Sequence, residues 1–242
     1  MPDLKIIYSF LIILVTCACG GTKVEETPYI MPDLDHGLLQ SPINIITDSI
    51  PEGHHQAIIR YQPSHEEISL LEHTIKVNYD NGSSINFYGN QYELQQFHFH
   101  TPAEHLIDGI TYPMEMHLVH SITNDSTKNN HYFVLAMLFK MSRTNEFLQE
   151  FIDNVPKNTK DIAHFRNKYF NLANLVKEEL KDYYHYTGSL TTPPYTETVH
   201  WAVSSHILGA SPDQIATVNL IEGNNARHIQ SVNGRKIEII HQ

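Results

Sequence analysis

The chain has 242 residues, of which 41% are hydrophobic, and this is enough for one large domain or at most two small ones. The formal net charge of −11 argues against nucleic acid and anionic lipid as partners, because both bind basic surfaces. Seventeen histidines are an unusually large number, and a single site can use only a few of them.

Residues 1–19 are predicted to be a signal peptide. Lys5 precedes an apolar run over residues 6–15, which is too short to span a bilayer and suits the core of such a peptide. Cys19 stands between small residues, as in bacterial lipoprotein signals whose cysteine becomes the lipidated N-terminus, and Cys17 is the alternative acceptor. The other interpretation is ordinary cleavage and release. In both cases we expect an exported protein of the periplasm or cell envelope without a disulfide framework, attached to a membrane only through a lipid.

Residues 20–35 are polar and lack periodicity, so we expect a tether, followed by one folded domain over residues 36–242. Alternating polar and apolar residues predict strands in this domain, and Asn81-Gly82 predicts a β-hairpin between the first two of them. The almost wholly apolar residues 135–139 are typical of a central strand buried on both faces. The expected strands cover residues 73–79, 84–88, 92–100, 114–121 and 131–140.

Few segments have the pattern of a helix. Residues 144–154 place three apolar side chains on one face behind a Thr or Asn cap. A second helix begins at Ser211, with a proline in its first turn, and residues 171–182 are a third candidate. The pattern as a whole predicts a mostly β domain (α+β) with a few peripheral helices.

The candidate functional site is a group of histidines in two predicted strands. Gln96, His98 and His100 alternate with phenylalanines, so the three polar side chains share one face of a strand. His117 lies in a second strand, and the turn signal at residues 108–109 allows the two strands to lie side by side. One strand histidine alone is usually a packing residue, but three imidazoles with a vacant fourth position form the ligand set of a catalytic zinc site.

Four motifs resemble those of the α-class carbonic anhydrases of the exported bacterial type, and they occur in that family's order. The motifs are QSPINI (40–45), QFHFHTPAEH (96–105), EMHLVH (115–120), and YTGSLTTPP (186–194) with ETVHW (197–201). The resemblance implies a single domain around a large, mainly antiparallel, twisted central β-sheet. It also implies that the protein hydrates carbon dioxide reversibly to bicarbonate and a proton through zinc-bound hydroxide, with esterase activity as a side reaction.

The resemblance makes His98, His100 and His117 the ligands of Zn²⁺. Gln96 and Glu115 are implied to hold two of the three rings, and each stands two residues before a ligand, so the strand period also puts it on the ligand's face. The third ring is implied to be held by the backbone carbonyl of Asn225. Cis peptide bonds are expected before Pro42 and Pro194.

Thr191 is implied to accept a hydrogen bond from the zinc-bound hydroxide and to donate its own proton to Glu104, because such a hydroxyl needs an acceptor of its own. His73 is implied to shuttle protons to buffer, and the alternative is an ordinary exposed strand histidine, since Lys76 stands where the family commonly has a neutral polar side chain. The implied substrate pocket for carbon dioxide and bicarbonate consists of Val119, Val134, Leu190, Thr192, Val199 and Trp201.

Two departures from the family pattern concern the N-terminus and the C-terminal motif. No counterpart of the family's N-terminal aromatic segment precedes residue 36, and His228 stands where the family has proline. The alternative function is a non-catalytic, carbonic-anhydrase-like binding module of the cell envelope. Retention of all three ligands together with Thr191 and Glu104 argues against that alternative.

Overall fold

The computed structural model describes residues 37–65, 67–71, 74–123, 130–158, 161–164 and 169–242. The chain from Asp35 to Gln242 forms one compact unit. The signal peptide, both cysteines, the tether and the shuttle candidate His73 lie outside the described residues. No helix in the described part of the chain is both long and apolar enough to cross a membrane.

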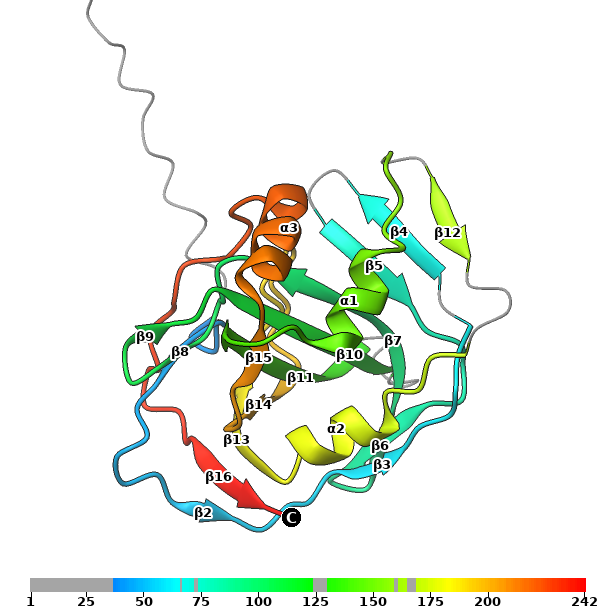
Figure 1. Ribbon diagram of the computed structural model, residues 1–242. Coiled ribbons are helices and arrows are strands. Elements are labelled where there is room, and N and C mark those ends of the chain that lie inside the picture. The colour runs from blue at the N-terminus through cyan, green and yellow to red at the C-terminus, as the bar shows by residue number, and fades with distance from the viewer. Residues whose placement is uncertain (1–36, 66, 72–73, 124–129, 159–160, 165–168) are drawn as a thin grey trace, which may run out of the picture. The chain divides into compact units, whose positions relative to one another are not determined.

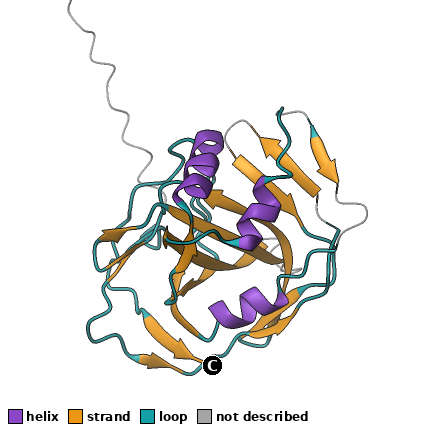
Figure 2. Ribbon diagram, in the orientation of Figure 1, coloured by secondary structure: helices purple, strands orange, loops and turns teal. Residues whose placement is uncertain are grey.

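A large twisted sheet makes up most of the fold, and the helices are few and short, as Figures 1 and 2 show. The prediction of a mostly β domain is therefore confirmed. The small sheet comprises β1 (Asn44–Ile45), β8 (Leu106–Ile107) and β9 (Ile110–Thr111). The large sheet comprises β2 (Glu52–Gly53), β3 (Ile58–Arg60), β4 (Glu67–Leu71), β5 (Thr74–Asn78), β6 (Ser84–Phe87), β7 (Asn90–His100), β10 (Met114–Thr123), β11 (Asn130–Met141), β12 (Ile162–His164), β13 (Asp182–Gly188), β14 (Val199–Ser204), β15 (Leu208–Ala210) and β16 (Glu238–His241).

The strands of the large sheet run in the order β12-β4-β5-β7-β10-β11-β14-β13-β16-β2. Most neighbours are antiparallel, as expected, whereas β11 is parallel to both β14 and β15, and β16 is parallel to β2. The middle of the sheet is formed by β7, β10 and β11 (Figure 1). Residues 133–139 of β11 are all buried, which confirms the prediction of a central strand covered on both faces.

The predicted hairpin at Asn81-Gly82 is wrong. The turn does join β5 to β6, but these two strands pair with different stretches of β7 and not with each other. Gly82 has a φ of +110°, so the local turn signal was real. A turn signal specifies only the local backbone path. Here β5 and β6 each form hydrogen bonds with the long strand β7 and none with each other.

The turn at Asp108-Gly109 closes a small hairpin between β8 and β9, with φ values of +50° and +76° at its two residues. The strands that carry the histidines, β7 and β10, pair directly in antiparallel register, as predicted. The segment that connects β7 to β10 therefore contains the β8–β9 hairpin and is not itself a tight turn.

The described residues form three helices, which pack on one face of the large sheet: α1 (Glu146–Ile152), α2 (Ala173–Glu179) and α3 (Pro212–Glu222). Their buried apolar side chains belong to the same cluster as the phenylalanines of β7. The Asn145 side chain caps α1 and Ser211 forms a capping box on α3, which confirms both predicted helix starts. The opposite face carries a second cluster that includes Val134, Val199 and Trp201.

The peptide bonds before Pro42 and Pro194 are cis, as expected, and a third cis bond precedes Pro102. All three lie within the motifs that the sequence singled out.

Candidate metal centre

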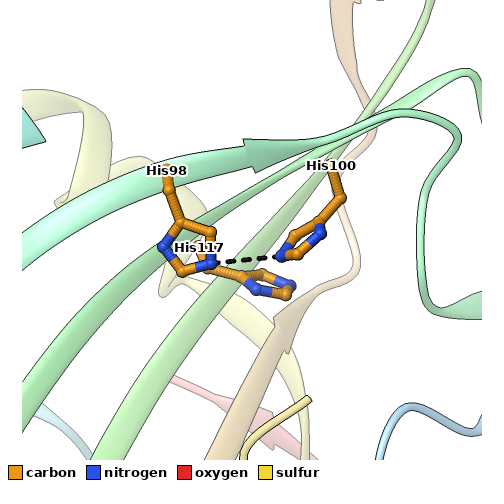
Figure 3. Close-up of side chains that lie close together, drawn as sticks. All are labelled: His98, His100 and His117. Atoms are coloured by element: carbon orange, nitrogen blue, oxygen red, sulfur yellow. Dashed lines mark hydrogen bonds between the residues drawn. The ribbon is translucent and has the colours of Figure 1, made fainter. Parts of the chain in front are cut away.

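The three histidines converge because β7 and β10 pair in one particular register. His117 on β10 lies directly opposite His98 on β7, and Glu115 lies opposite His100. Since side chains two residues apart share a face of a strand, the three imidazoles project to the same side of the sheet. Figure 3 shows the rings turned toward one another. Their ligand atoms all lie within 4.8 Å of each other.

Hydrogen bonds leave one nitrogen of His98 free to bind a metal. Its Nδ1 lies 3.0 Å from Gln96 Oε1, and a carbonyl oxygen can only accept, so Nδ1 carries the proton. The lone pair is then on Nε2, which lies 3.1 Å from Nε2 of His100 (Figure 3). The predicted pairing of Gln96 with His98 is therefore present.

Glu115 holds His117 in the same way. Its Oε1 accepts from His117 Nε2 at 2.7 Å, which leaves Nδ1 of that ring as the ligand atom. The same oxygen accepts from His105 Nδ1 at 2.6 Å, and Oε2 accepts from the backbone N–H groups of Glu104 and His105 at 2.8 Å each. Burial alone raises the pKa of this carboxyl, but the two histidines and their hydrogen bonds outweigh burial and keep the pKa well below its usual range.

His100 lies among polar groups, but its Nδ1 makes no hydrogen bond of acceptable geometry. The Asn225 carbonyl is nevertheless close enough to this buried nitrogen to favour the protonated ring. On the other side, Glu104 Oε2 lies 3.6 Å from His100 Nε2 and also has no hydrogen-bond partner. Two buried polar atoms without a hydrogen-bond partner, beside three converging imidazoles, form an environment that fits a metal ion and its further ligand.

The electrostatics of the site favour the neutral form of His98 and of His100. Burial is the main reason that the pKa of His98 is well below its usual value, and His100 and His117 lower it further. Lys76, which lies opposite His98 on β5, acts in the same direction. Burial also lowers the pKa of His100. Neutral imidazole is the form that binds metals, so this donor set fits zinc.

The apolar residues predicted for the substrate pocket lie together beside the histidines. Val134, Val199 and Trp201 are buried in one cluster, and Val119 and Leu190 pack against it. The Trp201 ring lies 4.9 Å from the His117 ring, measured between centroids. Thr192 is exposed at the turn that precedes the cis proline bond.

The described residues show no hydrogen bond between Thr191 and Glu104. Glu104 Oε1 accepts from the backbone N–H of Arg227 at 2.9 Å, whereas Oε2 is unpartnered. Thr191 is mostly buried, with 8% of its surface exposed. The interaction between the two therefore stays a prediction.

The motifs contain residues of the site to which the sequence assigned no role. The buried His105 bridges Glu115 and the Tyr186 hydroxyl, which lies 2.7 Å from His105 Nε2. Tyr186 in turn donates to Ser41 Oγ at 2.9 Å. His105 follows Glu104 directly in a quoted motif, but its partner Tyr186 is 81 positions away, and only the folded sheet brings the two together.

Glu222 at the end of α3 was also missed, and it secures Asn225. Its Oε2 accepts from Asn225 Nδ2 at 2.8 Å, and its Oε1 accepts from the backbone N–H of Ile75 on β5 at 2.8 Å. Burial raises the pKa of this carboxyl from 4.5 to about 8, against the Ile75 hydrogen bond, which lowers it. The sequence offered no signal for this contact, because an acidic residue at a helix end is usually solvated.

The raised pKa of Glu222 predicts a pH dependence of stability. Because the folded state binds this proton more tightly, the contribution is fully present below pH 4.5 and is lost as the pH rises through about 8. The contribution of this proton to the free energy of unfolding is on the order of several kcal/mol, because each pKa unit corresponds to about 1.4 kcal/mol. We expect the free energy of unfolding of the Glu222→Gln variant, relative to wild type, to rise between pH 5 and pH 9 in urea titrations. A difference that is constant over this range would contradict the assignment.

The hydrogen bonds of Glu115 predict its effect on metal affinity. The Glu115→Gln variant replaces an acceptor by an amide that cannot serve both histidines, so zinc affinity should fall about 10-fold to 100-fold. Competition with a chromophoric chelator measures this affinity. The matched control is Glu150→Gln, a change on the exposed side of α1, which should leave the affinity unchanged. Equal affinities for wild type and Glu115→Gln would refute the role.

Comparisons with known proteins agree with this geometry. A family model described as eukaryotic-type carbonic anhydrase matches residues 29–241. A carbonic anhydrase of Neisseria gonorrhoeae is 36% identical over 206 residues, which cover 83% of this chain and 77% of that protein. One of Nostoc sp. is 31% identical over 205 residues, covering 83% and 75%.

Solved structures show the same fold. The α-carbonic anhydrase of Photobacterium profundum superposes with a TM-score of 0.74 at 32% identity, covering 83% of this chain and 89% of that one. A hyperthermostable carbonic anhydrase from a hydrothermal vent chimney gives a TM-score of 0.75 at 34% identity, covering 85% and 89%. The chain therefore belongs to the eukaryotic-type, or α-class, carbonic anhydrase family.

Proposed function

We propose that this protein is a zinc-dependent carbonic anhydrase that hydrates carbon dioxide reversibly to bicarbonate and a proton. The observation that carries the proposal is the convergence of His98, His100 and His117, with Gln96 and Glu115 fixing the protonation of two of the rings. These three imidazoles would hold a zinc ion, and its Lewis acidity would make a water nucleophile available at neutral pH.

The protein's own residues orient and protect this chemistry. We propose that Thr191 donates its hydroxyl proton to Glu104 Oε2, a buried oxygen that has no other hydrogen-bond partner. The Thr191 oxygen is then oriented to accept a hydrogen bond at the reacting centre. The apolar wall of Val119, Val134 and Trp201 excludes water and offers carbon dioxide a weakly hydrated surface beside the metal ligands.

Two alternative functions have less support from the same site. Hydrolysis of activated esters would be a side reaction of the same nucleophile, because none of the pocket motifs supplies a serine nucleophile paired with a base. A non-catalytic binding module would not need Glu115 ionised at full burial between two histidines.

The function predicts two different losses for two substitutions. His117→Ala should lose both zinc and carbon dioxide hydration, because two imidazoles bind zinc less tightly than three. Thr191→Ala should keep its zinc and lose hydration activity by a factor on the order of 100. Metal analysis and stopped-flow hydration assays measure the two effects. Hydration activity retained by His117→Ala would contradict the ligand assignment, and full activity of Thr191→Ala would contradict the orienting role.

We propose further that His73 transfers the released proton to buffer. In the sequence His73 immediately precedes β5, and β5 pairs with β7, which carries His98 and His100. A His73→Ala variant should slow turnover most in weak buffer and recover when imidazole is added. An equal rate for wild type and variant in weak buffer would remove the shuttle from the mechanism.

We also propose that the chain is exported and lipid-anchored through Cys19, with Cys17 as the alternative. The support is the apolar run before two cysteines flanked by small residues. Mass spectrometry of the mature N-terminus should find a diacylglyceryl group on one of these cysteines. An unmodified N-terminus would show release without an anchor, and a retained residue 1 would contradict export.

A further inference from the structure

A second group of histidines lies on the other face of the sheet. His185 on β13 and His200 on β14 alternate with Tyr186 and Trp201, which belong to the apolar cluster beside the metal centre. By strand alternation, His185 and His200 therefore project to the opposite face. They sit diagonally across the β13–β14 pair, since His200 is opposite Thr187. The proposed function uses neither of them.

The separation of these two rings is that of two ligands of one metal ion. Nε2 of His185 lies 3.3 Å from Nδ1 of His200. Two nitrogens bound at about 2.0–2.1 Å to a tetrahedral ion are roughly 3.3 Å apart. The His98–His100 pair of the metal centre, at 3.1 Å, provides a comparison within the same molecule. Like that pair, His185 and His200 face each other through one nitrogen each.

A carboxylate lies near one ring, on the side away from the other histidine, but beyond hydrogen-bond distance. Glu238 lies opposite His185 in the β13–β16 pair, and its Oε2 is 3.9 Å from His185 Nδ1. Lys236 occupies the other oxygen of Glu238 at 2.5 Å. A carboxylate near Nδ1 favours the tautomer in which the lone pair of His185 is on Nε2, the nitrogen that faces His200.

Both rings of the pair are neutral, and one of them borders a cavity. Burial lowers the pKa of His185 to about 4 and also lowers that of His200, so both rings are uncharged at neutral pH. A cavity of about 400 Å³ opens beside His200 and is also lined by His131, Asn90 and Tyr92. It gives an ion a path to His200 and leaves room for water ligands.

We propose that His185 and His200 form a second binding site for a divalent transition metal, with water completing the coordination. Cu²⁺ should bind more tightly than Zn²⁺, following the general order of affinities for nitrogen ligands. The site should bind more weakly than the metal centre, because it presents two converging protein ligands and the metal centre presents three. This inference does not depend on the activity proposed above.

Metal titration of the zinc-loaded full-length protein, with its cysteines alkylated beforehand, tests the proposal. Wild type should keep one zinc through dialysis and take up one further equivalent of Cu²⁺ without releasing zinc. His200→Asn should keep the zinc and lose the Cu²⁺ equivalent. The matched control is His206→Gln, which removes an exposed histidine that also has a carboxylate partner, Glu179 at 3.0 Å, and it should bind as wild type does.

Two outcomes would overturn the second site: no further Cu²⁺ uptake by wild type, or unchanged uptake by His200→Asn. A measurement on wild type alone guards against a variant that fails to fold. The electron paramagnetic resonance spectrum of bound Cu²⁺ should show coupling to two imidazole nitrogens. Coupling to none or to one would equally exclude the pair as ligands.

Discussion

The structure of the site depends on one buried carboxylate, Glu115. Four donors converge on its two oxygens: the rings of His105 and His117 and the backbone N–H groups of Glu104 and His105. A fully buried carboxylate is costly unless it is hydrogen-bonded, and this one meets as many donors as its two oxygens accept. The ionised form therefore persists, which makes it a strong acceptor for His117.

Glu115 also links the metal ligands to the segment that carries Glu104. The backbone of residues 104 and 105 is tied to the same oxygen, so the loop after β7 is held against β10. Glu104 is in this way placed within 3.6 Å of His100. Ligand orientation and the position of the second carboxylate thus have a common cause. Hydrogen bonds from His105 to Tyr186 on β13, and from Tyr186 to Ser41, extend the same network beyond β7 and β10.

The period of two in residues 96–100 was sufficient to predict that Gln96, His98 and His100 share a face, because that property is local to one strand. The partnership with His117 needed only the antiparallel pairing of two strands, and it too was predicted. The hairpin at Asn81-Gly82 was not predictable, since strand pairing depends on competing edges such as that of β7. Glu222 and His105 were missed because their partners Ile75 and Tyr186 lie 147 and 81 positions away.

X-ray absorption at the zinc edge of the purified, zinc-loaded protein tests the central claim most directly. Three imidazoles around one ion predict three nitrogen scatterers at about 2.0–2.1 Å and one further light atom. The distinctive multiple-scattering pattern of imidazole rings should be present, with no sulfur at about 2.3 Å. A first shell dominated by carboxylate oxygen or by cysteine sulfur would contradict the account, because His98, His100 and His117 would then not share the ion.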